Sequence, residues 1–234
     1  MTKNEIRKLV KQQIKNISNE QKAEYSANIC KKIIESKEFV EADVVLCFMA
    51  LSDEPNIWDV IKQAFNSNKK VAIPRIKSGT SQMDFYLLKN DEDLQNQFIS
   101  GSYNILEPKD DLEKIKFCDE EKTLFLIPGV AFTKDGNRLG RGKGFYDIYL
   151  SKIIENCGKK NCCFMGVCFD VQKMDFLPTD IHDVKMDKVI KNSEFRILNS
   201  EFYKTFILRC RNRIQMSNHL VFLNLKLMFH EVFL

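Results

Sequence analysis

The order of short apolar runs and helical patterns constrains the fold of this chain more than any other feature of its sequence. An apolar run at residues 43–49 is followed by apolar side chains at helical spacing over residues 57–65, and then by a second short run at residues 70–74. Strand-like runs recur at residues 83–88, 123–127 and 163–169. Strands that alternate with helices are typical of parallel sheets covered on both faces. We therefore predict an α/β fold built on a mainly parallel sheet.

Two amphipathic helices are expected before the first strand. Apolar residues recur at helical spacing in the basic segment 3–15, and Ser18 stands where an N-cap residue would start a second helix. Lys3 and Arg7 share one face of the first helix, because they are four residues apart. Such a pair usually belongs to a solvated basic stripe, and an anion site is the alternative. Between the strands, the acidic region 89–121 predicts surface loops around one short element.

A glycine-rich loop follows the strand-like run at residues 123–127. Gly140, Gly142 and Gly144 alternate with Arg141 and Lys143, and a helical pattern begins directly after them. Glycines allow successive backbone N–H groups to turn toward one anion, and a helix N-terminus attracts the same charge. The spacing fits neither the dinucleotide-binding nor the Walker pattern. The loop therefore predicts another kind of phosphate site, at the carboxyl edge of the sheet where ligands bind.

Three acidic residues are candidates for the same edge of the sheet. Asp147 follows the glycine-rich loop and suits Mg²⁺, which binds carboxylate and phosphate oxygens together, although such an acid more often only starts a helix. Asp183 lies on a loop after the run at 163–169, and its alternative is a solvated acid. Glu54 precedes the helix of residues 57–65, so it either faces a ligand or caps that helix. The sequence leaves these alternatives open.

Composition limits the classes of partner. The chain has 234 residues, of which 44% are hydrophobic, and a net charge of only +4. One domain of ordinary size can bury such a core, and with so little net charge we do not expect nucleic acid as a partner. The chain has 8 cysteines without a paired C-x-x-C arrangement and only 3 histidines. This pattern predicts buried thiols in a reducing compartment, not disulfides or structural zinc.

The ends of the sequence bear on location. Neither a signal-peptide pattern nor an apolar stretch long enough to span a membrane is present, so we expect a cytoplasmic protein that does not enter membranes. The basic segment 3–15 leaves a mitochondrial presequence as the alternative, against which Glu5 and the lack of serine before Ser18 count. The sequence changes character near residue 195. We expect a main domain at residues 1–198 and an extension at residues 199–234, which either binds a partner or is absent from the working protein.

Residues 127–132 (IPGVAF) and 135–147 (DGNRLGRGKGFYD) closely resemble the signature of the 5-formyltetrahydrofolate cyclo-ligase family. Weaker similarities to the family extend over residues 3–195. The resemblance implies a three-layer α/β/α fold with a mainly parallel sheet, similar to sugar-phosphate isomerases and CoA-transferase-like proteins. It also implies a ligase that uses ATP and Mg²⁺ to convert 5-formyltetrahydrofolate to 5,10-methenyltetrahydrofolate, ADP and phosphate. We expect the protein to be a monomer.

The resemblance further implies roles for individual residues. Arg141 and Lys143 would be catalytic, and Asp147 and Asp183 would bind Mg²⁺. The ATP-binding residues would be Lys3, Arg7, Arg138, Leu139, Gly140, Arg141, Gly142, Lys143, Gly144, Phe145 and Tyr146. The folate-binding residues would be Met49, Glu54, Tyr103, Arg141, Gly142, Lys143, Gly144 and Phe145. Phe145 and Tyr103 stand where the family often has tyrosine and tryptophan, so one hydroxyl group and one indole ring are missing.

Two other functions are alternatives. The same fold without activity would be a folate- or nucleotide-binding regulator, which binds ATP and forms no product. Arg209, Arg211 and Arg213 in the extension suggest an RNA-interacting protein instead. Removal of residues 199–234 would abolish RNA affinity if that alternative holds.

Overall fold

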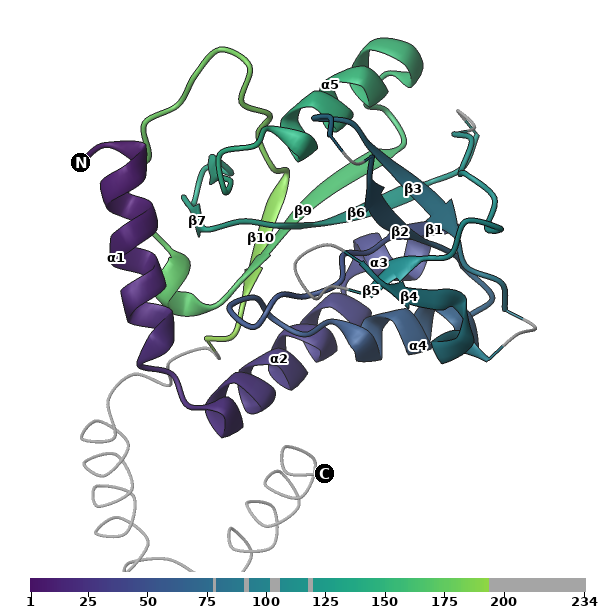
Figure 1. Cartoon of the computed structure of the whole chain (residues 1–234), viewed down its shortest axis with the longest axis horizontal. Helices are drawn as coiled ribbons and strands as arrows, with labels where there is room; N and C mark the ends of the chain where they lie inside the picture. The colour runs from purple at the N-terminus through teal and green to yellow at the C-terminus, as the bar shows by residue number, and fades with distance from the viewer. Residues whose placement is uncertain (78, 91–92, 102–105, 118–119, 194–234) are drawn as a thin grey trace, which may run out of the picture. The chain divides into compact units, whose positions relative to one another are not determined.

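A six-stranded sheet forms the centre of the computed structural model (Figure 1). The structure describes residues 1–193, apart from 78, 91–92, 102–105 and 118–119. The strand order is β10-β9-β6-β1-β2-β3, and every neighbouring pair is parallel except β2 and β3. The strands are β1 (Val44–Leu46), β2 (Lys70–Ile76), β3 (Met83–Leu87), β6 (Thr123–Pro128), β9 (Cys162–Cys168) and β10 (Lys188–Lys191). The prediction of an α/β fold with a mainly parallel sheet is confirmed.

Helices cover both faces of this sheet (Figure 1). Val45 points into the core on one face, which α2 (Asn19–Ile34), α3 (Lys37–Glu41) and α4 (Trp58–Asn66) cover. Val44 and Leu46 point to the other face, which α5 (Phe145–Cys157) covers. Because successive side chains of a strand alternate between faces, a central parallel strand needs apolar residues at every position. This explains why residues 123–127 and 163–168 were recognisable as continuous apolar runs.

The first helix, α1 (Lys3–Lys15), lies at the edge of this arrangement. A capping box formed by Thr2 and Glu5 starts it. Its apolar face, with Ile6 among the buried residues, packs on the short hairpin of β7 (Ala131–Phe132) and β8 (Arg138–Leu139). That hairpin leads directly into the glycine-rich loop, so the packing of α1 places its polar face next to the loop.

Several elements differ from the sequence-based expectation. The strand expected at residues 43–49 is only β1, because the chain leaves the sheet after Leu46. Residues 89–121 contain a 3-10 helix, Leu94–Gln97, and the hairpin of β4 (Phe98–Ser100) and β5 (Leu106–Pro108). Strand β10, helix α3 and the β7–β8 hairpin were not predicted, because each is short and has no clear apolar period.

Some sequence-based expectations fall outside the described residues. Tyr103 is one of them, and so are the three arginines of the C-terminal extension and the proposed boundary at residue 198. Of the expected buried thiols, Cys30, Cys47 and Cys168 are buried in the described part of the chain. Burial raises the pKa of Cys30 to about 11, so this thiol stays protonated near neutral pH.

Candidate functional site

A pocket of about 910 Å³ opens at the carboxyl ends of β1, β2 and β6, beside α1. Its volume is at the upper end of the range of about 300–1,000 Å³ that small-molecule sites usually have. Every site residue expected from the sequence lines this pocket, except Tyr103, which lies outside the described residues. The expected residues that line it are Lys3, Arg7, Met49, Glu54, Asp147, Asp183 and residues 138–146. The structure thus brings together residues from opposite ends of the domain.

The glycine-rich loop enters α5 through two glycines with positive φ. Gly142 has φ 98° and Gly144, the N-cap of α5, has φ 72°. No side chain caps the α5 N-terminus, so its first N–H groups remain available at the pocket wall. A Cβ atom at Gly142 would lie 3.5 Å from the guanidinium carbon of Arg7, which shows how closely α1 approaches the loop. The loop therefore has the form of an anion site.

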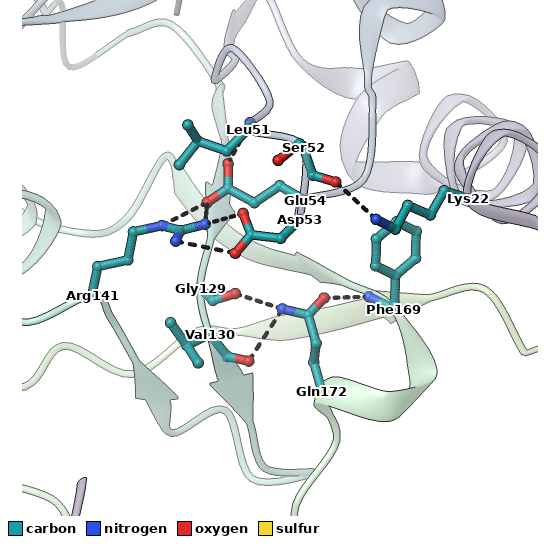
Figure 2. Close-up of polar contacts among 10 residues, drawn as sticks. All are labelled: Lys22, Leu51, Ser52, Asp53, Glu54, Gly129, Val130, Arg141, Phe169 and Gln172. Carbon is teal, nitrogen blue, oxygen red and sulfur yellow. Dashed lines mark hydrogen bonds and ion pairs between the residues drawn. The ribbon is translucent and has the colours of Figure 1, made fainter. Parts of the chain in front are cut away.

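The two cations of the loop differ in their surroundings. Lys143 is exposed and makes no hydrogen bond or ion pair with the part of the chain that the structure describes. Arg141 instead binds two acids from the loop after β1 (Figure 2). Its Nη2 lies 2.6 Å from Asp53 Oδ1 and 2.8 Å from Glu54 Oε1. Lys143 is free to meet a ligand, whereas Arg141 joins two walls of the pocket.

Glu54 is a nearly buried acid, with only 6% of its side chain exposed. Its second carboxylate oxygen accepts a hydrogen bond of 3.1 Å from the backbone N–H of Leu51 (Figure 2). Burial raises the pKa of Glu54, while the charge of Arg141 acts in the opposite direction. Glu54 does not cap α4, because that helix starts after Ile57 without a side-chain cap. Glu54 lines the pocket instead, and its contact with a ligand stays a prediction.

A second, more deeply buried ion pair lies on the other side of the loop. Arg138 Nη2 donates to Asp147 Oδ1 at 2.8 Å, and the guanidinium lies 5.5 Å from the centre of the Tyr146 ring. Only 4% of the Arg138 side chain is exposed, and its Nε has no partner within the described chain. The buried Arg138 thus orients Asp147. The family resemblance had suggested only that Arg138 contacts a nucleotide.

Asp147 and Asp183 are neighbours in space. The backbone N–H of Val184 donates to Asp147 Oδ1 at 3.3 Å, while Asp183 Oδ2 accepts a bond of 2.8 Å from Lys3. Partial burial opposes ionisation of Asp183, but hydrogen bonds from Lys3 and from the backbone of Asp180 hold its pKa below the ordinary value. Lys3 also binds Asp180 at 2.7 Å, a partner that the sequence did not reveal.

This acid pair fits a hard divalent cation. One oxygen of each carboxylate, Oδ2 of Asp147 and Oδ1 of Asp183, accepts no hydrogen bond from the described residues. Within those residues no group of three or more His, Cys, Asp or Glu side chains could hold a metal. Mg²⁺ needs no larger set, since it usually binds one or two carboxylates and takes water and phosphate oxygens for the rest.

The pocket has two chemically different ends. Lys3, Arg7, Lys11 and Lys15 recur every four residues on α1 and line one side of it. The other end is formed by the apolar side chains of Phe48, Met49, Leu51, Pro74, Ile76 and Met83, together with Glu107. The sequence indicated Lys3, Arg7 and Met49 but missed the rest. The four-residue spacing of Lys11 and Lys15 was the available signal for those two.

Gln172 connects the chain segments that follow β6 and β9. Its side chain is buried, and Nε2 donates to the carbonyl oxygens of Gly129 at 2.7 Å and Val130 at 3.1 Å (Figure 2). Its Oε1 accepts a bond of 2.7 Å from the backbone N–H of Phe169. These bonds tie the chain after β6 to the chain after β9, so the hairpin that carries Arg138 has a defined position.

Comparison with known proteins gives consistent results. Residues 1–192 match the model of the 5-formyltetrahydrofolate cyclo-ligase family. A mouse protein named 5-formyltetrahydrofolate cyclo-ligase is 31% identical over 186 residues, which cover 79% of this chain and 91% of the mouse protein. A Caenorhabditis elegans protein named as a probable enzyme of this type is 31% identical over 206 residues, covering 85% of this chain and 96% of its own.

A solved structure supports the fold. The NMR structure of Aquifex aeolicus 5,10-methenyltetrahydrofolate synthetase superposes with a TM-score of 0.65 at 24% sequence identity, covering 83% of this chain and 91% of that one. At this identity the similarity concerns the fold alone. Among the described residues, no helix is long and apolar enough to cross a membrane.

Proposed function

Because the chain belongs to the 5-formyltetrahydrofolate cyclo-ligase family, we propose that it uses ATP to close the ring of 5-formyltetrahydrofolate, releasing 5,10-methenyltetrahydrofolate, ADP and phosphate. The observation that carries this proposal is one pocket with a cationic, glycine-rich end and an apolar end. ATP phosphates suit the first end and a flat ring system suits the second. Arg141 binds Asp53 and Glu54 after β1, while Gly140 accepts a hydrogen bond from Arg7 of α1, so the loop lies between these two parts of the pocket and favours transfer of a phosphoryl group between two bound substrates.

The proposed reaction has two steps. First, the formyl oxygen of the folate bonds to the γ-phosphorus of ATP, and the bond from that phosphorus to the bridging oxygen of ADP breaks. Then N10 attacks the formyl carbon and loses its proton, while the carbon–oxygen bond breaks and phosphate leaves. Phosphorylation is needed because a formyl oxygen is a poor leaving group. Both steps require cations and N–H groups around the phosphoryl group more than they require a protein nucleophile.

We assign the main catalytic role to Lys143 and Arg141. The lack of any partner for Lys143 in the described chain supports this role, since its ammonium group can bind the transferring phosphoryl group. The bonds from Arg141 to Asp53 and Glu54 support a second role, in which Arg141 holds the loop against the folate side. Lys3, Arg7, the backbone of residues 138–144, and Phe145 and Tyr146 would bind ATP.

Mg²⁺ would bind Asp147 and Asp183 and would neutralise charge on the ATP phosphates. Arg138 orients Asp147 by the bond of 2.8 Å, and Lys3 orients Asp183 in the same way. On the folate side, Met49 and Glu54 would contact the substrate together with residues 141–145. The folate contact expected for Tyr103 stays a prediction, because this residue lies outside the described part.

We further propose that the protein works as a monomer in the cytoplasm. The pocket is lined by residues of a single chain, so the proposed reaction does not call for a second copy. Lys3 and Arg7 reach the pocket from α1, so cleavage of a presequence within this helix would remove residues that the proposal needs. The intact mass of the protein from its native cells tests the role of the extension. A mass that corresponds to a chain ending near residue 195 would favour the view that the working protein lacks the extension.

Near-UV absorbance tests the proposed function. Wild-type protein with 5-formyltetrahydrofolate and Mg²⁺ should show an absorbance rise only after ATP is added, because the conjugated methenyl bridge absorbs where the substrate does not. Asp147→Asn should abolish the rise, and Asp175→Asn, an exposed acid outside the pocket, should leave it unchanged. Measurable ATP binding without any rise would instead identify a non-catalytic binding protein.

A further inference from the structure

Glu107 is a carboxylate at the apolar end of the pocket that accepts no hydrogen bond from the described residues. It lies on β5, and only 15% of its side chain is exposed. Within the described part of the chain its ionic neighbour is Arg75, whose Nε lies 3.8 Å from Glu107 Oε2. That distance is too long for a hydrogen bond. Arg75 therefore compensates the charge of Glu107, and within the described residues no group donates a hydrogen bond to its oxygen atoms.

A purely structural role of Glu107 would be to hold Arg75 in place. Arg75, however, already donates from Nη1 to the carboxylate of Asp110 and lies 3.4 Å from the carbonyl oxygen of Pro108. These contacts orient the guanidinium without Glu107. A carboxylate that is mostly removed from water normally has hydrogen-bond donors, since their absence costs free energy. A bound ligand can supply the missing donors.

The backbone fixes the direction of the Glu107 side chain. Strands β4 and β5 pair Ile99 with Glu107, and Gly101 directly follows β4. A Cβ atom at Gly101 would lie 2.2 Å from the carboxyl carbon of Glu107, so the side chain lies directly over this glycine. A larger residue at position 101 would require Glu107 to move. The hairpin thus holds the carboxylate at one place on the pocket wall.

The surroundings define what the carboxylate can bind. Pro74, Ile76 and Met83 line the same pocket, and apolar side chains of this kind suit a flat heteroaromatic ring. An ionised carboxylate is acceptor-only and can receive two parallel N–H bonds from one planar group. The pyrimidine ring of a folate has such an edge, formed by its exocyclic 2-amino group and the adjacent ring N3–H.

We propose that Glu107 determines specificity by accepting two hydrogen bonds from this donor edge of the folate ring. The inference rests on the proposed function and adds to it the residue that recognises the far end of the substrate. Glu107 is separate from Glu54, whose oxygens already accept from Arg141 and from the backbone of Leu51. The ring would lie with its donor edge at β5 and with the formyl group toward the glycine-rich loop.

Glu107→Gln tests the proposal with little change in shape. A glutamine keeps one acceptor but presents a donor where the carboxylate had its second acceptor. We expect KM for 5-formyltetrahydrofolate to rise about tenfold or more, with kcat and KM for ATP changed by less than about twofold. The control is Asp110→Asn, which alters the other acidic partner of Arg75 at a side chain that is 84% exposed. It should leave all three constants within about twofold of wild type.

A substrate analogue that lacks the 2-amino group separates recognition from a structural effect. Wild-type protein should bind the 2-desamino analogue of 5-formyltetrahydrofolate at least about tenfold more weakly than the parent, measured by calorimetry without ATP. The further loss caused by Glu107→Gln should be much smaller for the analogue than for the parent. Equal losses for both compounds would overturn the proposal, and so would an unchanged KM in the variant.

The proposed cyclo-ligase function and the proposed role of Glu107 can fail independently. If wild-type protein forms no product with ATP, the proposed function fails, whatever the variant does. If wild-type protein is active and binds the analogue as tightly as the parent, only the role of Glu107 fails. This second comparison uses wild-type protein alone, so it remains decisive even if Glu107→Gln does not fold.

Discussion

Arg141 Nη2 lies 2.8 Å from Oε1 of Glu54, and this ion pair joins the glycine-rich loop to the loop that follows β1. The two residues are separated by 87 positions in the chain, yet they form opposite walls of one pocket. The pair is unequal, because 44% of the Arg141 side chain but only 6% of the Glu54 side chain is exposed. The buried acid, not the cation, should therefore control how firmly the two loops are held together.

Replacing Glu54 should destabilise the protein more than replacing its neighbour Asp53. Glu54→Met removes the acceptor for both Arg141 and the N–H of Leu51. We expect the free energy of unfolding to fall by about 2–4 kcal/mol, because the lost bonds are nearly buried. Asp53→Asn, at a side chain that is 27% exposed, should cost less than about 1 kcal/mol.

Urea unfolding followed by circular dichroism measures both changes. Equal losses for the two variants would contradict the view that burial, and not the number of contacts to Arg141, decides the contribution. A loss of unfolding free energy in Asp53→Asn alone would contradict the expected importance of the buried Glu54 more directly.

Acid should weaken the contact between α1 and the loop that carries Asp183. Partial burial raises the pKa of Asp183, but hydrogen bonds from Lys3 and from the backbone of Asp180 lower it more. The folded-state pKa of Asp183 is therefore below its ordinary value of 3.8. For an acid with a lowered pKa, the stabilisation is present above the ordinary pKa and is lost as the pH falls through the folded value. The free energy of unfolding should thus decline below about pH 4.

Lys3→Met isolates this contribution. Without the ammonium group the pKa of Asp183 returns toward its ordinary value, so the decline between about pH 4 and 2 should be shallower than in wild type. Lys8→Met removes an exposed lysine of the same helix that makes no hydrogen bond or ion pair with the described residues, and it should keep the wild-type slope. Identical slopes for all three proteins would show that Lys3 does not set the pKa of Asp183.

Two glycines at the ends of α5 provide a matched test of the phosphate site. Gly144, before the helix, has φ 72°, and Gly158, after it, has φ 69°. A Cβ atom at Gly144 would make an ordinary contact of 3.7 Å with Ile148 Cδ1, and one at Gly158 would meet nothing within 4 Å. Alanine at each should cost about 1–3 kcal/mol of stability, because L-residues rarely adopt these conformations. Only Gly144→Ala should raise KM for ATP, by about tenfold, since the N-terminal N–H groups move with it.

KM for ATP should be compared between the two variants under conditions in which the same fraction of each protein is folded. This comparison separates an effect on the phosphate site from a general loss of stability. If Gly158→Ala raised KM for ATP as much as Gly144→Ala does, the effect would come from general loss of stability. The proposed position of the ATP phosphates at the start of α5 would then lose its support.

The sequence revealed the central strands and the glycine-rich loop because both are determined by neighbouring residues. After Thr123, the run is apolar at every position from Leu124 to Ile127, since β6 is covered on both faces, and this pattern is visible without the fold. The alternating glycines and cations of the loop are equally local. Their expected position after a strand and before a helix is confirmed by β6 and α5, although the β7–β8 hairpin intervenes.

The partners of the site residues were not predictable, because they come from distant parts of the chain. Asp53 and Asp180 were not singled out, and only the fold brings them to Arg141 and Lys3. Glu107 had no signal of its own in an acidic region that was expected to consist of surface loops. Arg138 was expected at the nucleotide because it belongs to the loop sequence, whereas its burial beside Asp147 depends on how α5 packs. Local patterns thus identify a site, and tertiary contacts determine what each residue does in it.

Lys143 provides the most direct test of the chemical step. Its side chain is exposed and unpartnered within the described residues, so Lys143→Ala should fold normally, with a free energy of unfolding within about 0.5 kcal/mol of wild type. If its ammonium group stabilises the transferring phosphoryl group, kcat should fall by about 100-fold or more, while KM for ATP changes little. Lys11→Ala, which removes another cation of the same pocket but one on α1, should leave kcat within about threefold. An unchanged kcat in Lys143→Ala would refute the catalytic assignment, and an equal fall in both variants would mean that the pocket responds to its total charge and not to this one lysine.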